Sequence, residues 1–161
     1  MKKPLRIALY VLLALVLIVL AYVIYVFASY YRIEDWQKLG VAHCYSASAA
    51  TMDSAPQTGV TYRVSSANVG FGAYSDDYSF FMDGGKESRA RSRQAVDENM
   101  RGEVSLVKDL SPDFALFQEV DIDGTRSWHI AEDAYLDDAM GGNEFDEVFA
   151  QNYDSPYLFY P

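Results

Sequence analysis

The first part of the chain is a continuous apolar stretch, and a periodic pattern of apolar and polar residues begins only after it. Residues Ile7–Ala28 carry no charge and are almost all apolar. As a helix, this stretch would span roughly 33 Å, which matches a bilayer. Lys2, Lys3 and Arg6 precede it, so the positive-inside rule places the amino terminus in the cytoplasm and the rest outside. We therefore expect residues 1–28 to form a transmembrane anchor of a single-pass cell-membrane protein whose C-terminal domain is extracytoplasmic.

A cleaved signal peptide is the alternative to this anchor. Val26-Phe27-Ala28 is a passable small-residue cleavage site. The apolar run is longer than the roughly 7–15 residues of a signal-peptide core, which favours a retained anchor.

Residues 29–59 are expected to form a juxtamembrane segment and linker. The part through Gly40 could extend the anchor as a short helix, whereas Cys44–Gly59 is rich in Ser, Ala and Thr and has no apolar period. Cys44 is the only cysteine, so no intrachain disulfide can form. His43 is interpreted as a surface histidine.

Two strand patterns and one helix pattern organise residues 60–161. Val60–Val69 alternates between apolar and polar residues and predicts a strand. Glu87–Leu110 places apolar residues at helical spacing on one face and predicts a helix. Asp113–Val120 contains four apolar residues in a row, which is typical of a strand buried on both faces. Strand, helix and strand in this order predict a right-handed unit with parallel strands, and hence an α/β fold.

The remaining segments give weaker patterns. Gly70–Gly85 is a long aromatic-rich loop that we expect to pack over the rim of the sheet. His129–Met140 predicts a short acidic helix closed by Gly141-Gly142, and Phe145–Gln151 predicts a third strand. The final run, Tyr157–Pro161, resembles an unfinished buried segment.

The charge of the chain narrows the range of partners. After Ala28, 10 Lys and Arg residues stand against 23 Asp and Glu residues, a net charge of −13. This excess disfavours binding to nucleic acid or to an anionic bilayer through bulk charge. It suits cation binding, although solubility is the commoner reason for such a composition.

Polar residues end both predicted strands. Asn68 closes the first strand, and Gln118 and Glu119 close the second. A carboxylate at the carboxyl end of a buried strand is costly unless it is paired or bound to a metal, and open α/β sheets place ligand groups there. Glu119 could instead be the first solvated residue after the strand. Parallel neighbours joined by a crossover share an edge, so we expect Asn68 beside Glu119.

With Arg63–Val69 as one motif and Pro112–Val120 as the other, the chain resembles the endonuclease/exonuclease/phosphatase superfamily, whose members include pancreatic deoxyribonuclease and neutral sphingomyelinases. The resemblance implies the N-terminal half of a four-layered α/β-sandwich. It also implies catalytic roles for Asn68 and Glu119, with Glu119 as the ligand of Mg²⁺ or Mn²⁺, and hydrolysis of a phosphodiester or phosphomonoester. The loop Gly70–Ser88 also looks like that of membrane-anchored bacterial members.

The chain departs from this family in its second half. The family's second half carries an Asp-x-Asn motif, a catalytic histidine and a terminal Asp-His pair, and no Asp-x-Asn or Asp-His sequence follows Val120 here. His129 is a candidate general base, or simply a surface histidine near Trp128. We therefore expect a truncated phosphoesterase, with a catalytically inactive membrane-anchored remnant or binding module as the alternative.

Other charged groups are weaker candidates. Lys86 and Arg89, near the start of the predicted helix, could bind a substrate phosphate, or could belong to a solvated basic face with Arg91 and Arg93. Asp121 and Asp123 could add metal ligands or could be turn residues.

The acidic residues farther along the chain lack the spacing of a calcium loop and are interpreted as a solvated face. They are Glu132, Asp133, Asp137, Asp138, Glu144, Asp146 and Glu147. No specific protein partner is predicted, and the substrate could be a nucleic acid, a phospholipid or a sugar phosphate.

Overall fold

The computed structural model describes residues 3–31, 33–42, 56–141 and 145–154. The chain divides into two units, Met1–Gly40 with Phe149–Pro161, and Val41–Val148. His43, Cys44, most of the expected linker and the final apolar run lie outside the described residues, so the predictions made for them stay predictions.

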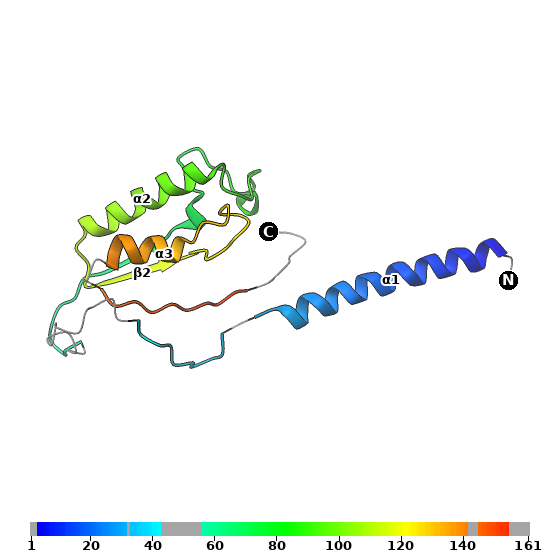
Figure 1. Cartoon of the computed structure of the whole chain (residues 1–161), viewed down its shortest axis with the longest axis horizontal. Helices are drawn as coiled ribbons and strands as arrows, with labels where there is room; N and C mark the ends of the chain where they lie inside the picture. The colour runs from blue at the N-terminus through cyan, green and yellow to red at the C-terminus, as the bar shows by residue number, and fades with distance from the viewer. Residues whose placement is uncertain (1–2, 32, 43–55, 142–144, 155–161) are drawn as a thin grey trace. The chain divides into compact units, whose positions relative to one another are not determined.

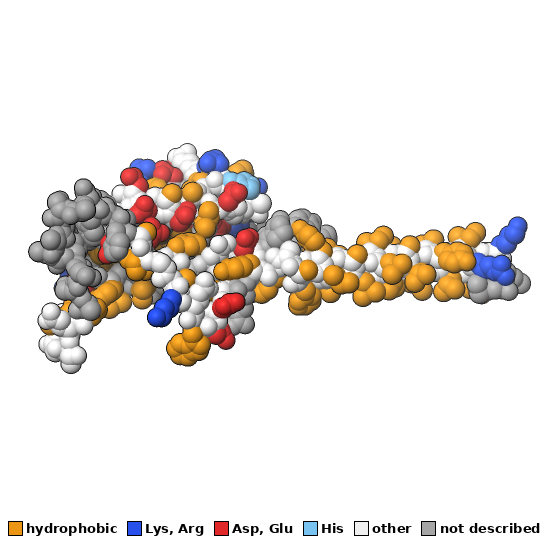
Figure 2. Space-filling view, turned by 60° about the horizontal axis from the view of Figure 1, so that its bottom comes forward, with side chains coloured by type: hydrophobic (Ala, Val, Ile, Leu, Met, Phe, Trp, Pro, Cys, Tyr) orange, Lys and Arg blue, Asp and Glu red, His pale blue; other side chains and the backbone are white. Residues whose placement is uncertain are grey.

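The N-terminal helix α1 spans Lys3–Ser29 and confirms the predicted apolar helix. None of its side chains is buried, and Figure 2 shows apolar side chains along its length with basic side chains at its N-terminal end. Among the described residues it is the one helix long and apolar enough to cross a membrane.

The expected continuation of this helix to Gly40 is wrong. The helix ends at Ser29, and the Tyr31 backbone N–H donates to the Asp154 carbonyl at 3.0 Å. This bond takes the backbone out of the helical pattern. Beyond it, the Gln37 N–H donates to the Glu34 carbonyl in a turn in which Trp36 has φ +64°.

The second unit is built on a parallel pair of strands, as predicted. Strand β1 spans Val64–Asn68 and pairs with β2, Phe114–Gln118, in the register Val64 to Phe114 and Asn68 to Gln118. Helix α2, Arg93–Asp109, connects them and lies over the pair (Figure 1). The described residues therefore form a mixed α/β unit.

Both strands are shorter and more exposed than expected. Ala115 and Phe117 pack against the core, but Phe114 and Leu116 are 41% and 52% exposed. Side chains alternate across a strand, and α2 covers only one face of this pair, so the prediction of a strand buried on both faces is wrong. The first strand begins at Val64 rather than Val60.

Helix α2 buries the predicted apolar face, made of Val96, Met100, Val104 and Val107. It begins later than Glu87 because the Ser92 hydroxyl caps it by accepting from the Ala95 N–H at 3.1 Å. The Glu87 carboxylate instead accepts from the Ser79 N–H at 2.7 Å, which holds the preceding loop.

The aromatic loop packs at the carboxyl edge of the strands, as expected. It contains two short 3₁₀ turns, η1 at Gly70–Gly72 and η2 at Phe81–Asp83. Phe71 is fully buried and contacts Tyr74, Tyr78 and Phe80 with ring centroids 5.9–6.4 Å away. The Phe71 N–H donates to the Glu119 carbonyl at 3.0 Å, which ties the loop to the end of β2.

The predicted acidic helix is present in shorter form. Helix α3 spans Glu132–Leu136 and continues as one π-helical turn, η3, Asp137–Gly141, so that Leu136 and Met140 join the core. The predicted third strand is wrong, because Glu147 forms only an isolated antiparallel bridge to Ala42.

Two glycines should respond to alanine in opposite directions. Gly72 has φ +61°, and a Cβ there would lie 2.6 Å from Val96 Cγ1, so Gly72→Ala should lower the free energy of unfolding. Gly102 lies inside α2 with nothing within 4 Å of a Cβ, so Gly102→Ala should raise it by about 0.5–1 kcal/mol.

Thermal unfolding of the full chain in detergent measures both changes. Equal effects of the two substitutions would contradict this packing of η1 against α2.

Candidate active site

The parallel register brings the two predicted site residues into contact. Asn68 is the last residue of β1, and Glu119 directly follows β2. The Asn68 side-chain amide Nδ2 donates to Glu119 Oε1 at 3.0 Å, while Asn68 Oδ1 accepts from the Gly70 N–H at 2.9 Å. The expected placement of Asn68 beside Glu119 is confirmed, and their catalytic and metal-binding roles stay predictions.

The backbone at this point adopts unusual conformations. Glu119 has φ +56° and Phe71 has φ +46°. A side chain in this left-handed region costs roughly 1–2 kcal/mol, and such residues cluster at ligand sites. The Phe71–Glu119 backbone hydrogen bond joins the two strained positions and ties the Glu119 backbone to the loop.

A pocket of about 260 Å³ opens at the same point, lined by Asn68, Gly70, Tyr74 and Glu119. Gly70 has φ +52°, and a Cβ there would lie 2.3 Å from the Tyr74 ring, so only glycine allows the ring this close. Burial raises the pKa of Tyr74, and the negative charges of Asp83 and Glu119 add to the rise. The phenol therefore stays protonated and can donate a hydrogen bond.

Glu119 itself is more accessible than the sequence suggested. Its side chain is 42% exposed, so water solvates the carboxylate, and Glu119 does not carry the cost of a buried charge that the sequence pattern predicted. Its Oε2 lies 3.5 Å from Arg126 Nη1, which supplies a positive charge from within the chain.

Arg126 is the site residue that the sequence did not reveal. Its Nε and Nη2 bind the Asp121 carboxylate at 2.9–3.2 Å, and its guanidinium lies 4.2 Å from the centre of the Phe71 ring. Burial lowers the pKa of Arg126, but the hydrogen bonds and charge of Asp121, with Glu119 and Glu132, more than offset this and raise the pKa overall. Arg126 is not part of either strand motif. It lies next to Glu119 because the chain turns back after β2.

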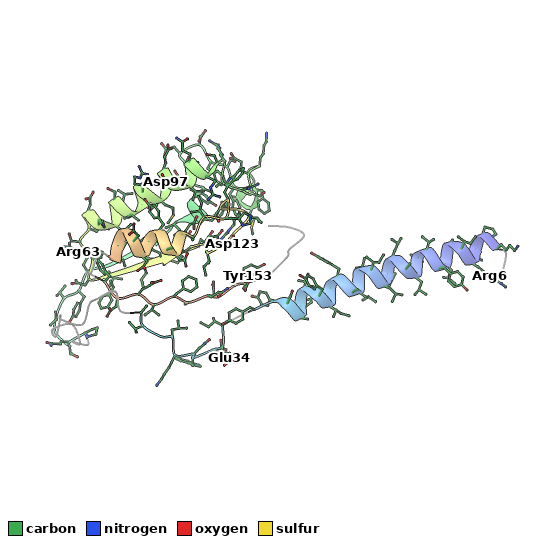
Figure 3. The ribbon with its side chains drawn as sticks, in the orientation of Figure 1. Arg6, Glu34, Arg63, Asp97, Asp123 and Tyr153 are labelled. Atoms are coloured by element: carbon green, nitrogen blue, oxygen red, sulfur yellow. The ribbon has the colours of Figure 1, made fainter. Side chains whose placement is uncertain are left out.

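The two aspartates after the strand are already engaged. Asp121 holds Arg126, and Asp123 lies 2.7 Å from His129 Nδ1. Figure 3 shows Asp123 at the opposite end of the unit from Arg63, which precedes β1. The interpretation of both aspartates as turn residues accounts for these contacts without a metal.

Glu132 corrects the interpretation of the acidic residues as a solvated face. Its side chain is fully buried, its Oε2 accepts from the Asp121 N–H at 2.9 Å, and its own N–H donates to the Asp121 carbonyl at 2.8 Å. Its Oε1 makes no hydrogen bond within the described part of the chain. Burial raises the pKa of Glu132 to about 7, against the opposing hydrogen bond from Asp121.

The basic residues before and at the start of α2 do not line this pocket. The Arg89 guanidinium stacks 3.4 Å from the centre of the Trp128 ring, and Arg93 Nη1 donates to the Trp128 carbonyl at 2.6 Å. Neither Lys86 nor Arg89 is among the residues that line the pocket, and His129 is not among them either. Their predicted roles gain no geometric support.

The pocket offers one carboxylate, that of Glu119, as a donor for a divalent cation. Among residues 3–31, 33–42, 56–141 and 145–154, no group of three or more His, Cys, Asp or Glu side chains could hold a metal. With one carboxylate, Mg²⁺ would keep most of its waters and would take further ligands from substrate phosphates.

Comparison with family models, curated proteins and solved structures finds no match to this chain.

Glu132 should make the stability of the fold depend on pH. Its folded pKa of about 7 lies above the ordinary value of 4.5, so the folded state binds the proton more tightly than the unfolded state. The resulting stability is complete below pH 4.5 and is lost as the pH rises through 7, by an amount on the order of 3 kcal/mol.

Unfolding of the full chain across this pH range, compared with Glu132→Gln, measures the effect. The neutral glutamine should flatten the profile, whereas the exposed control Glu98→Gln should not. A profile unchanged in Glu132→Gln would mean that the carboxylate is solvated rather than buried.

Proposed function

We propose that this chain carries the metal-binding half of a phosphoesterase site related to the endonuclease/exonuclease/phosphatase superfamily. The observation that supports this most is the contact of Asn68 with Glu119 at adjacent carboxyl ends of parallel strands. The two strand motifs that carry the resemblance end at these residues. The pocket beside them is open to a ligand.

Each residue has a role that its contacts allow. The Glu119 carboxylate holds Mg²⁺ or Mn²⁺, and the bound ion supplies charge neutralisation at a phosphate oxygen. The Asn68 amide fixes one carboxylate oxygen through its 3.0 Å hydrogen bond, and the Tyr74 hydroxyl offers a neutral donor at the pocket wall. In the complete reaction, water forms a new P–O bond, the ester P–O bond breaks, and the alcohol leaves with a proton.

The described residues do not supply a base for that water. His129 Nδ1 is engaged by Asp123, and the pocket is lined by other residues. General-base catalysis needs a group within hydrogen-bond reach of the proton that it removes. For residues 1–161 alone we therefore propose cation binding without turnover, which is the second candidate function, a membrane-anchored binding module.

The exposed side of the strand pair supports the proposal of a larger sandwich. Val64, Phe114 and Leu116 are 58%, 41% and 52% exposed and share the face opposite α2. An apolar face of this kind normally packs against a further layer. We propose that this layer is the second sheet of a four-layered α/β-sandwich.

The orientation of the membrane segment is also a proposal. Lys3 and Arg6 lie at the N-terminal end of α1, and the unit that carries the pocket follows the helix. By the positive-inside rule, this unit is extracytoplasmic.

Glu119→Gln should remove divalent-cation affinity. Titration of the full chain with Mn²⁺ in detergent should give weak binding in the wild type, because one carboxylate leaves most ligands to water, and none in the variant. Glu98→Gln, an exposed charge change on α2, should bind as the wild type does.

A generic phosphodiester assayed in parallel should show no turnover. Equal Mn²⁺ affinity in wild type and Glu119→Gln removes Glu119 from the ligand role, and turnover that survives Glu119→Gln refutes the proposed relationship.

The full-length product should fractionate with membranes, and external protease should cleave residues 56–148 in intact cells. The physical reason is the uninterrupted apolar surface of α1 with its basic N-terminal end. Recovery in the soluble cytosol, or protection from the protease, would contradict the proposed orientation.

A further inference from the structure

Among the described residues, one guanidinium nitrogen at the edge of the site has no hydrogen-bond partner. Arg126 uses Nε and Nη2 on Asp121, whereas Nη1 has only the 3.5 Å ion-pair contact with Glu119 Oε2. Nη1 makes no hydrogen bond within the part of the chain that the structure describes. The Arg126 side chain is 34% exposed, and Nη1 lies 3.5 Å from Glu119, which lines the pocket, although Arg126 itself is not among the lining residues.

The rest of the Arg126 side chain is held in place. Asp121 accepts hydrogen bonds from one edge of the guanidinium, and the Phe71 ring packs against its flat face, with 4.2 Å between Cζ and the ring centre. Asp121 is itself fixed by two hydrogen bonds with Glu132. A guanidinium fixed in this way loses little conformational freedom when it binds an anion, and its planar donors match the oxygens of phosphate.

Charge decides when an anion can bind here. Glu119 and Asp121 carry two negative charges against the one positive charge of Arg126, so the cluster is net negative and repels phosphate. A divalent cation on Glu119 adds two positive charges, which cancel this negative charge even when Glu132, the partner of Asp121, is ionised. Nη1 then faces a site from which the repulsion by Glu119 has been removed.

We propose that Arg126 Nη1 binds a phosphate oxygen of the substrate, and that it does so only when a divalent cation neutralises Glu119. This inference rests on the proposed function, because it assigns the phosphate-binding residue of the same site. It makes Arg126 a substrate-binding residue and makes anion binding conditional on the cation.

The first test uses the wild-type full chain in a maltoside detergent, which carries no phosphate. The Nε–Hε resonance of Arg126 is followed by NMR during titration with inorganic phosphate, with and without Mg²⁺. The resonance should shift on phosphate addition only when Mg²⁺ is present. A shift of equal size without Mg²⁺, or no shift with it, overturns the inference and needs no variant to fold.

The second test compares variants in Mg²⁺. Arg126→Gln should weaken phosphate binding about tenfold, equivalent to about 1.4 kcal/mol, because a charge-assisted hydrogen bond is lost. Arg126→Lys should retain part of the affinity. Arg101→Gln, which removes the 2.6 Å surface pair with Asp97, makes the same charge change and should leave phosphate binding unchanged.

Cation affinity separates the two proposals. Arg126→Gln should bind Mg²⁺ at least as tightly as the wild type, because a positive charge next to Glu119 is removed. Absence of Mg²⁺ binding in the wild type defeats the proposed function itself. Mg²⁺ binding with equal phosphate affinity in wild type and Arg126→Gln overturns the role of Arg126 alone.

Discussion

Every feature of the candidate site depends on the parallel pairing of β1 with β2. The register places Asn68 opposite Gln118, so that the next residue, Glu119, meets the Asn68 amide at 3.0 Å. A parallel pair needs a crossover to return the chain, and α2 provides it while covering one face with Val96, Met100, Val104 and Val107. Sliding the register by one residue would move Glu119 away from Asn68 and turn Ala115 and Phe117 out of the core.

Charged side chains lie together at the carboxyl edge of the strand pair, outside the apolar core. Glu119 stays partly exposed, and Arg126 lies between Glu119 and Asp121. Glu132 is buried behind Asp121 with a raised pKa. The Phe71 ring joins this charged group to the apolar core, because its buried ring packs within the aromatic loop and also carries the Arg126 guanidinium. The pocket is formed where the aromatic loop meets the strand ends, next to this charged group.

Part of this arrangement could be predicted from sequence because the signals are local. The apolar face of α2 follows helical periodicity, and Asn68 and Glu119 each end a short apolar or alternating run. The predicted helix boundaries are wrong where a single hydrogen bond accompanies the start or end of the helix. Ser92 caps α2, and the Tyr31–Asp154 hydrogen bond accompanies the end of α1. Neither interaction changes the periodicity of apolar residues in the sequence.

The exposure of β2 and the role of Arg126 could not be predicted for a different reason. An apolar run such as Phe114–Phe117 is compatible with a strand covered on one face or on both faces. The sequence of the strand does not show which layers pack against it. Arg126 reaches Glu119 only through the turn after β2, and a turn of this kind brings together residues with no pattern of spacing. Glu132 could not be distinguished from the neighbouring acidic residues by sequence, because it differs from them in burial and not in residue type.

Paramagnetic broadening by Mn²⁺ tests the central claim, that Asn68 and Glu119 form a cation site, most directly. In the full chain, Mn²⁺ at low occupancy should first broaden the side-chain amide of Asn68 and the backbone amides of Gly70 and Phe71, which surround the Glu119 carboxylate. Broadening centred instead on the acidic residues of α3 and η3, or scattered over the surface, would contradict a cation site at the strand ends.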